Sequence, residues 1–184
     1  MLKILIVDDH AIVRRGLKQI LEGEQELATV SEAKDGHEAL QLTREQAWDL
    51  VILDINLPGQ SGLDVLIELR HLNPKLPVLI MSMYSEDQYA VQAFKAGAVG
   101  YLNKQSAPEE LVKAIKKISA GGKYVSDSMA ELLAANMNMQ RDKTAQEILS
   151  NREYQVLILI ASGKTLSEIG ETLNLSVKTI SGTV

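Results

Sequence analysis

Side chains that could handle a phosphoryl group or a divalent cation recur at the ends of apolar runs in this chain. Asp8 and Asp9 follow the first run, Asp54 the third, Ser82 the fourth, and Lys104 lies two residues past the fifth. Carboxylates gathered in a partly desolvated cleft repel one another strongly unless a cation lies between them. Mg²⁺ is the cation that this set favours, because it is a hard ion bound by carboxylates, waters and phosphoryl oxygens.

The same residues fit the chemistry of a phosphorylated aspartate. Asp54 would be the acceptor, Lys104 would place a positive charge beside it, and the Ser82 hydroxyl could donate to a phosphoryl oxygen. Together these groups would stabilise the phosphoaspartate and the negative charge of the transfer step. We expect an acyl-phosphate site here.

The elements that must position these residues follow from the apolar pattern. Continuous apolar runs alternate with segments of helical period, which is typical of a parallel sheet covered on both faces. Two helical stripes are predicted, one over Leu111, Ala114, Ile115 and Ile118, the other over Leu63, Leu66, Ile67 and Leu69 to Leu72. The predicted fold is α/β, a (βα)5 flavodoxin-like doubly wound domain, whose ligands bind beyond the carboxyl ends of the strands. The five predicted strands are Ile4–Val7, Leu27–Ala33, Leu50–Leu53, Val78–Met81 and Ala98–Leu102.

The domain boundaries follow from glycine placement and polarity. Gly121 and Gly122 are placed to end the fifth helix, so the first domain is predicted over residues 1–122. Residues 123–148 read as a short helix and an interdomain linker. Residues 149–184 contain only short helical patterns and form a small all-α unit, predicted as an incomplete helix-turn-helix. Capping boxes at Ser150 and Thr165 open its first two helices, and Gly163 ends the first.

Composition narrows the class of protein further. The 184 residues contain 19 Lys and Arg against 24 Asp and Glu, and the excess acid lies before residue 140, so any contact with nucleic acid is expected in the C-terminal part. The absence of cysteine excludes disulfides and thiolate metal sites. No apolar run approaches the roughly 20 residues that span a bilayer, and no signal peptide precedes Asp8. We expect a cytoplasmic protein without membrane contact.

The motifs in their order resemble the NarL/FixJ family of two-component response regulators. Residues 1 to about 120 are similar to a receiver domain, and residues 149–184 to the start of a LuxR-type helix-turn-helix. The resemblance rests on the following residues: Asp8-Asp9, Asp54-Ile-Asn-Leu-Pro-Gly59, Gly62, Ser82, Ala96 to Lys104, Leu149-Ser-Asn-Arg-Glu153, and Leu173-Asn-Leu-Ser-Val-Lys-Thr179.

The resemblance implies a role for each site residue. Asp54 takes phosphate from the phosphohistidine of a sensor histidine kinase, while Lys104 and Ser82 hold the phosphoryl group. Mg²⁺ is bound by Asp9, Asp54 and the backbone carbonyl of Asn56, with Asp8 contributing mainly through water. Tyr101 swings inward when Ser82 moves. Phosphorylation then releases the helix-turn-helix or favours a homodimer, and double-stranded DNA is the expected partner of the full-length protein.

The C-terminal residues depart from the LuxR-type pattern. The expected third helix has room for barely two turns before Val184, and Gly182 lies inside it, where glycine costs about 1 kcal/mol relative to alanine. Lys178 and Thr179 remain the candidate contacts to DNA. Few phosphate contacts mean weak, salt-sensitive binding, so we expect impaired DNA binding for a helix-turn-helix truncated in this way.

Two other functions are alternatives to a DNA-binding response regulator. A receiver that acts through protein contacts alone, without DNA output, would bind another partner when phosphorylated. A haloacid-dehalogenase-type phosphatase would place its nucleophile after the first strand and a second Asp two residues on, whereas Asn56 stands there. The chain is therefore expected to be a switch with only self-directed phosphorylation and dephosphorylation, not an enzyme. Gly59 and Gly62 are expected to serve backbone conformation, and His10 to be a surface residue at a helix start.

Overall fold

A computed structural model of the chain describes residues 1–23, 28–106, 108–126, 129–131 and 151–173, together with Leu175 and Thr179. Several sequence predictions fall outside these residues: the linker over 132–148, the Ser150 cap, Lys178 and the turns around Gly182. In the described part, no helix is long and apolar enough to cross a membrane.

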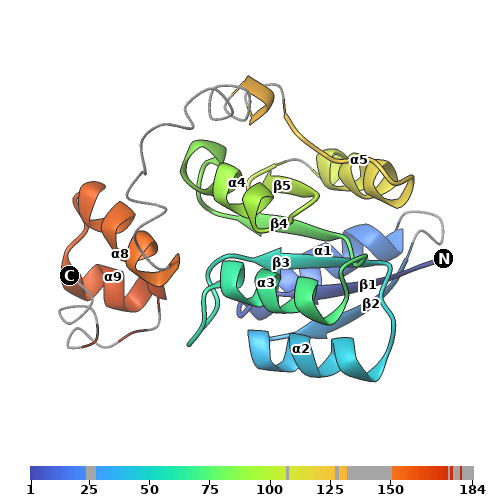
Figure 1. The fold of residues 1–184 in the computed structure, drawn as a ribbon, viewed down its shortest axis with the longest axis horizontal. Coiled ribbons are helices and arrows are strands. Elements are labelled where there is room, and N and C mark those ends of the chain that lie inside the picture. The colour runs from blue at the N-terminus through green and yellow to red at the C-terminus, as the bar shows by residue number, and fades with distance from the viewer. Residues whose placement is uncertain are drawn as a thin grey trace.

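Five parallel strands form the central sheet, in the order β2-β1-β3-β4-β5 (Figure 1). In this order β1 lies between β2 and β3, so the chain adds strands first on one side of β1 and then on the other. This arrangement confirms the doubly wound α/β prediction. Three strands end one residue later than predicted, so that Asp54, Ser82 and Asn103 are the last residues of β3, β4 and β5. The strands are β1 (Leu2–Val7), β2 (Ala28–Ala33), β3 (Leu50–Asp54), β4 (Val78–Ser82) and β5 (Gly100–Asn103).

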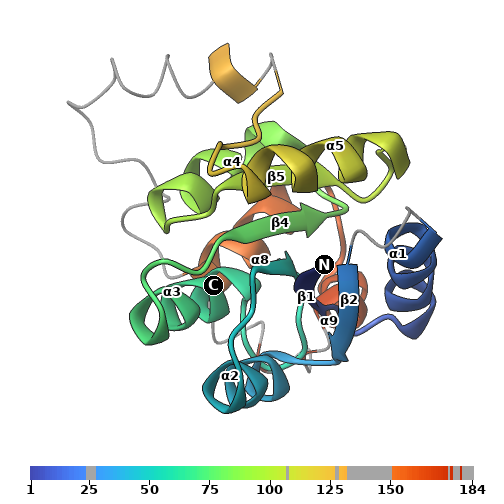
Figure 2. The same cartoon turned by 90° about the vertical axis from the view of Figure 1, so that its right-hand side faces the viewer.

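Helices cover both faces of the sheet. In Figure 2, α1 and α5 lie on one side of the strands, and α2, α3 and α4 lie on the other. The helices of this domain are α1 (Ala11–Gly23), α2 (Gly36–Glu45), α3 (Gly62–Leu72), α4 (Glu86–Lys95) and α5 (Pro108–Ser119). Gly121 has φ of +84°, and the amides of Gly121 and Gly122 donate to the carbonyls of Ile118 and Lys117, so glycine ends α5 as predicted.

The core of this domain is divided by the sheet. Ile4 and Ile6 point to the cluster under α1 and α5, whereas Leu5 and Val7 point to the cluster under α2, α3 and α4. Continuous apolar strands are required because each face is buried against helices. The α5 stripe is buried as predicted.

The α3 stripe is narrower than predicted. Its buried positions are Gly62, Leu63, Val65, Leu66 and Leu69, while Ile67 and Leu72 are exposed. The prediction was wrong there because the run of consecutive apolar residues is wider than the face that a helix can bury against a sheet.

A second, smaller helical unit follows, made of α8 (Asn151–Ala161) and α9 (Leu166–Leu173). Gly163 with φ of +78° ends α8, and Thr165 and Glu168 form the predicted reciprocal capping box at the start of α9. Its own core consists of Val156, Leu159, Ile169 and Leu173. The cartoon shows the unit beside the edge at which the parallel strands end (Figure 1).

Candidate functional site

The carboxyl ends of β1, β3 and β5 bring three charged groups together. Lys104 Nζ lies 2.6 Å from Asp8 Oδ2 and 2.7 Å from Asp54 Oδ2, so a single ammonium bridges both carboxylates. The Lys104 amide donates to the Ser82 carbonyl at 2.8 Å, which fixes the residue directly after β5 against the end of β4. Parallel strands place their ends at one edge of the sheet, which is why residues nearly a hundred positions apart meet here.

Asp54 is buried, with only 2% of its surface exposed, and its two carboxylate oxygens differ in their hydrogen bonding. Its Oδ2 accepts from Lys104, whereas Oδ1 has no hydrogen-bond partner among the described residues. Burial raises the pKa of Asp54 to about 6; Lys104 opposes the rise and Asp8 adds to it. For Lys104, burial alone would lower the pKa, but the neighbouring carboxylates of Asp54 and Asp8 raise it. A buried carboxylate that is paired with a cation through one oxygen, and has no hydrogen-bond partner on the other, suits an acceptor of a positive or electrophilic group.

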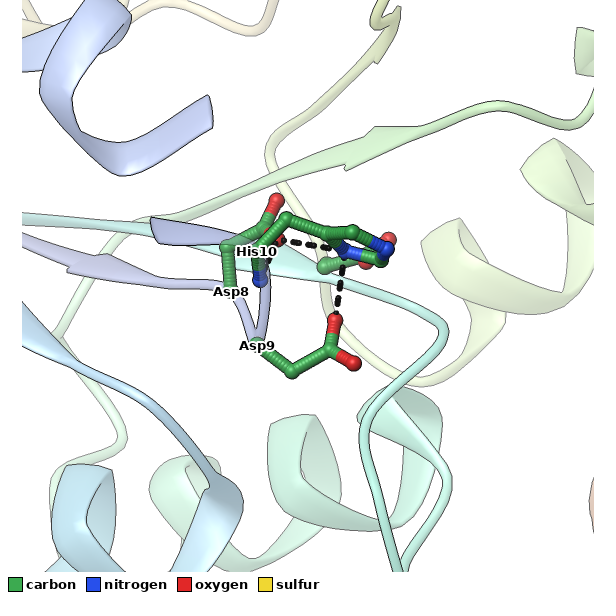
Figure 3. Close-up of side chains that lie close together, drawn as sticks. Asp8, Asp9 and His10 are labelled. Carbon is green, nitrogen blue, oxygen red and sulfur yellow. Dashed lines mark hydrogen bonds and ion pairs between the residues drawn. The ribbon is translucent and has the colours of Figure 1, made fainter. Parts of the chain in front are cut away.

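Asp9 and His10 extend the cluster toward solvent (Figure 3). His10 Nδ1 lies 2.7 Å from Asp9 Oδ1 and 3.2 Å from Asp8 Oδ1, although 64% of the His10 side chain is exposed. Ligand atoms of Asp8, Asp9, His10 and Asp54 all lie within 4.8 Å of one another, a spacing that a divalent cation could bridge. His10 is thus the member of this cluster that the sequence reasoning set aside, since adjacency to an acidic pair does not tell where an imidazole points.

The loop after β3 is shaped by two glycines. A Cβ on Gly62 would overlap the Asp54 carbonyl oxygen and lie 2.7 Å from Ile55 Cα, so the start of α3 can pack against the acceptor strand only without a side chain. Gly59 has φ of +80°, which L side chains rarely adopt. The Gly62 amide donates to the Ile55 carbonyl at 2.8 Å, and Ser61 Oγ caps α3 by accepting from Leu63. Both glycines serve backbone conformation, as predicted.

Ser82 and Tyr101 meet through the segment after β4. Ser82 is fully buried, and its Oγ accepts from the Tyr84 amide at 3.2 Å. Tyr101 is fully buried, and its hydroxyl donates to the Tyr84 carbonyl at 3.1 Å. Asn103 Nδ2 donates to the same carbonyl at 3.3 Å. The backbone of Tyr84 is therefore the physical link between the end of β4 and the β5 aromatic.

The α8–α9 unit contacts the acceptor loop directly. Gln155 Nε2 donates to the Ile55 carbonyl at 3.3 Å and to Asn56 Oδ1 at 3.4 Å. A cavity of about 480 Å³ lies between the two parts of the chain. Its lining comes from both: Asp9, His10, Asp54, Asn56, Met83, Tyr84 and Lys104 on one side, and Leu159, Lys164, Glu171 and Thr172 on the other.

The remaining predicted residues differ in their relation to this cavity. Asn56 lines it, but Ser82 is not among the lining residues. Thr179 is exposed in a helical conformation, and Lys178 lies outside the described residues, so their proposed contacts with DNA stay predictions. The boundaries placed at residues 122 and 149 also stay predictions.

Comparison with protein families gives two matches. Residues 4–116 match the response regulator receiver domain, and residues 147–182 match the bacterial regulatory proteins of the luxR family. The first match spans the five-stranded sheet and its helices, and the second spans α8 and α9.

Curated relatives match along nearly the whole chain. The response regulator UvrY of Escherichia coli (strain K12) is 34% identical over 182 residues, covering 98% of this chain and 83% of the relative. The response regulator GacA of Pseudomonas aeruginosa is 35% identical over 181 residues, covering 98% and 85%. The nitrate/nitrite response regulator protein NarL of Escherichia coli (strain K12) is 34% identical, covering 96% and 83%.

Solved structures agree with these matches. A LuxR-family two-component response regulator from Aurantimonas has a TM-score of 0.68 at 37% identity, covering 75% of this chain and 99% of that one. The response regulator RcsB in complex with DNA has a TM-score of 0.67 at 27% identity, covering 99% and 87%. The chain belongs to the NarL/FixJ family of two-component response regulators, which join a receiver domain to a LuxR-type DNA-binding domain.

Proposed function

We propose that this response regulator is switched by phosphorylation of Asp54, with the phosphoryl group supplied by a sensor histidine kinase and the output made on double-stranded DNA. The observation that carries the proposal is the state of the Asp54 carboxylate. It is buried, one oxygen is paired with Lys104, and the other has no hydrogen-bond partner among the described residues; Asp54 lines a cavity that Asp9 also lines.

In the transfer step, an Asp54 oxygen forms a bond to phosphorus as the bond from phosphorus to the donor nitrogen breaks. The donor imidazole keeps the electron pair and leaves as neutral histidine after taking up a proton. Lys104 is held by Asp8 and Asp54 at the position where it can neutralise a phosphoryl oxygen without reorganising. Positioning and charge stabilisation supply most of the catalysis in phosphoryl transfer, which matches what these residues offer.

The residues present fit a Mg²⁺ ion. Asp9 and Asp54 would hold it directly together with the backbone carbonyl of Asn56, and Asp8 would act mainly through water. The uncompensated Asp54 Oδ1 and the 4.8 Å clustering support this assignment. When bound, the ion would offset the repulsion among the carboxylates and the charge of the phosphoryl oxygens.

The switch proposed for this site runs through Ser82 and Tyr101. Ser82 would give up the Tyr84 amide to hold a phosphoryl oxygen, and Tyr84 also carries the carbonyl that the Tyr101 hydroxyl binds. Movement at the acceptor would then reach the buried face of β5 through one residue. Such a two-state element is what a phosphoryl group must bias to have an effect at a distance.

Output on DNA is supported by the luxR-family match and by the similarity to RcsB, whose structure was solved with DNA. A related structure holds two RcsB dimers on two DNAs, which supports a homodimer as the active form of this chain. Lys178 and Thr179 are the proposed contacts to the duplex.

Phosphorylation by acetyl phosphate in the presence of Mg²⁺, followed by intact-mass measurement, tests the acceptor. We expect one phosphoryl adduct on the parent chain, none on Asp54→Asn, and an undiminished adduct on Asp49→Asn, whose carboxylate is exposed and accepts from the Lys3 amide. An adduct of equal yield on Asp54→Asn would contradict the proposal.

A further inference from the structure

The α8–α9 unit closes over the acceptor rather than standing clear of it. Its residues Leu159, Lys164 and Thr172 line the same cavity of about 480 Å³ as Asp54 and Lys104. The acceptor therefore lines a partly open cavity, one wall of which belongs to the α8–α9 unit.

Two buried side chains of α8 contact the receiver, in addition to Ile158, which packs against the receiver core, and Tyr84 of the receiver, which packs against the α8–α9 core. Tyr154 is 6% exposed and belongs to the receiver core, where its ring packs edge-on against Tyr89 with 5.6 Å between centroids. Gln155 is fully buried, and its amide donates to the Ile55 carbonyl and Asn56 Oδ1 in the acceptor loop. Neither residue belongs to the core of the α8–α9 unit. These two contacts can therefore be removed without removing the packing that holds α8 to α9.

The cavity is large enough for a small donor. Its volume is within the range of small-molecule sites, and a free phosphodonor is small beside it. It is partly open to solvent, and two of its lining residues are themselves exposed, His10 with 64% of its side chain and Met83 with 56%. A protein donor, in contrast, needs roughly 800 Å² of contact surface on each partner around the reacting atoms. Here α8 and α9 occupy the surface that such a contact would use.

We propose that the docked α8–α9 unit is a size filter for phosphodonors, with Tyr154 and Gln155 as the residues that set this specificity. Small donors reach Asp54 in the docked chain, whereas a phosphohistidine carried by a protein reaches it only after the unit has left. The inference rests on the proposed role of Asp54 and adds to it a selection between donors. When free phosphohistidine is the small donor, the transfer chemistry is the same for both donors, because a phosphorus–nitrogen bond breaks and an Asp54 oxygen–phosphorus bond forms in each.

The test compares two donors that share one leaving group. Free phosphohistidine is the small donor, and a four-helix-bundle histidine-phosphotransfer protein bearing phosphohistidine is the large one. Both are given with Mg²⁺ to the full chain and to Tyr154→Ala/Gln155→Ala, and adduct formation is followed by intact mass. We expect the double variant to accept phosphate from the bundle at least tenfold faster than the parent, while its rate with free phosphohistidine stays within threefold.

Further variants separate docking from damage. Gln155→Glu sets a carboxylate against the Ile55 carbonyl and Asn56 Oδ1, so it should undock the unit and reproduce the shift without loss of side-chain bulk. Leu157→Ala, at an α8 position that is 41% exposed, should match the parent with both donors. Circular dichroism of each variant establishes that α8 and α9 are still helical.

Three outcomes would overturn the filter. Equal acceleration with both donors would mean that the docked unit closes the site to all donors. Unchanged rates with both donors, or no transfer from the bundle to any form, would mean that the unit is not what limits a protein donor. Failure of free phosphohistidine and acetyl phosphate to modify either the parent or the double variant would instead refute Asp54 as acceptor, and so the proposed function itself.

Discussion

The two parts of this response regulator have hydrophobic cores of very different size. The receiver buries an apolar cluster on each face of its sheet, and every strand contributes to them. The α8–α9 unit has a core of four buried side chains, and Tyr154 on α8 is buried in the receiver core instead. Small units have too little interior to be stable alone. The difference indicates a rigid domain that carries the chemistry and a small domain whose stability depends partly on where it is docked.

The largest expected effect tests the rigid side of this comparison. Leu5→Ala removes a fully buried side chain from the interior strand β1 and should lower the free energy of unfolding of the receiver by about 3 to 4 kcal/mol. Urea unfolding followed by the fluorescence of Trp48, the only tryptophan, measures it. The control Ile67→Ala, at a position 37% exposed on α3, should change stability by well under half as much. Equal losses would contradict the assignment of the core.

The next effect concerns the free-energy cost of burying the charged Asp54 carboxylate in the receiver. A raised pKa of about 6 means that the folded protein holds the Asp54 proton more tightly than the unfolded chain, whose carboxyl titrates near 4. Stability therefore falls as pH rises from about 4 to 6, and the loss is complete above that range. In EDTA at pH 8, Asp54→Asn should gain about 2 to 3 kcal/mol of unfolding free energy, and the gain should vanish near pH 4. Loss of stability in Asp54→Asn at pH 8 would show that the buried charge is well compensated.

A substitution in the small domain tests whether the α8–α9 unit unfolds independently of the receiver. Ile169→Ala removes part of the four-residue core of the α8–α9 unit. It should abolish the slow amide exchange of α8 and α9, and the loss of protection can be no larger than the free energy of unfolding of the unit itself. The Trp48 unfolding transition of the receiver should move by less than about 0.5 kcal/mol, as for a distant, independent site. Hydrogen exchange with mass spectrometry resolves the two parts. A matching loss of protection in the sheet would mean that the chain unfolds as one unit.

The smallest effect concerns a helix cap. Thr165 Oγ1 accepts from the Glu168 amide at the start of α9, so Thr165→Ala should cost about 1 kcal/mol, confined to this helix. Faster amide exchange in α9, with unchanged exchange in the sheet, is the expected result. Thr165→Ser keeps the acceptor oxygen and should restore most of the protection.

The convergence of Asp8, Asp54 and Lys104 was predictable from sequence because parallel strands end at one edge of a sheet. The capping box at Thr165 and the positive φ of Gly163 were predictable because they depend on neighbouring residues. These features are local or follow from topology.

Other features depend on side-chain packing between distant elements. Gln155 binds a carbonyl 100 positions away, and no periodicity in either segment signals that contact. The imidazole of His10 turns toward Asp8 and Asp9 rather than solvent alone, and the Tyr101 hydroxyl binds the Tyr84 carbonyl. Each outcome is decided by the surroundings in three dimensions, which the residue types by themselves do not specify.

Borohydride trapping tests the central assignment most directly, since it converts an acyl phosphate on aspartate to homoserine at the position that carried it. After acetyl phosphate and Mg²⁺, peptide mass spectrometry should find homoserine at residue 54 and leave Asp8 and Asp9 as aspartate. Homoserine at residue 8 or 9, or an unmodified peptide containing Asp54 in a protein that had gained phosphate, would contradict the account.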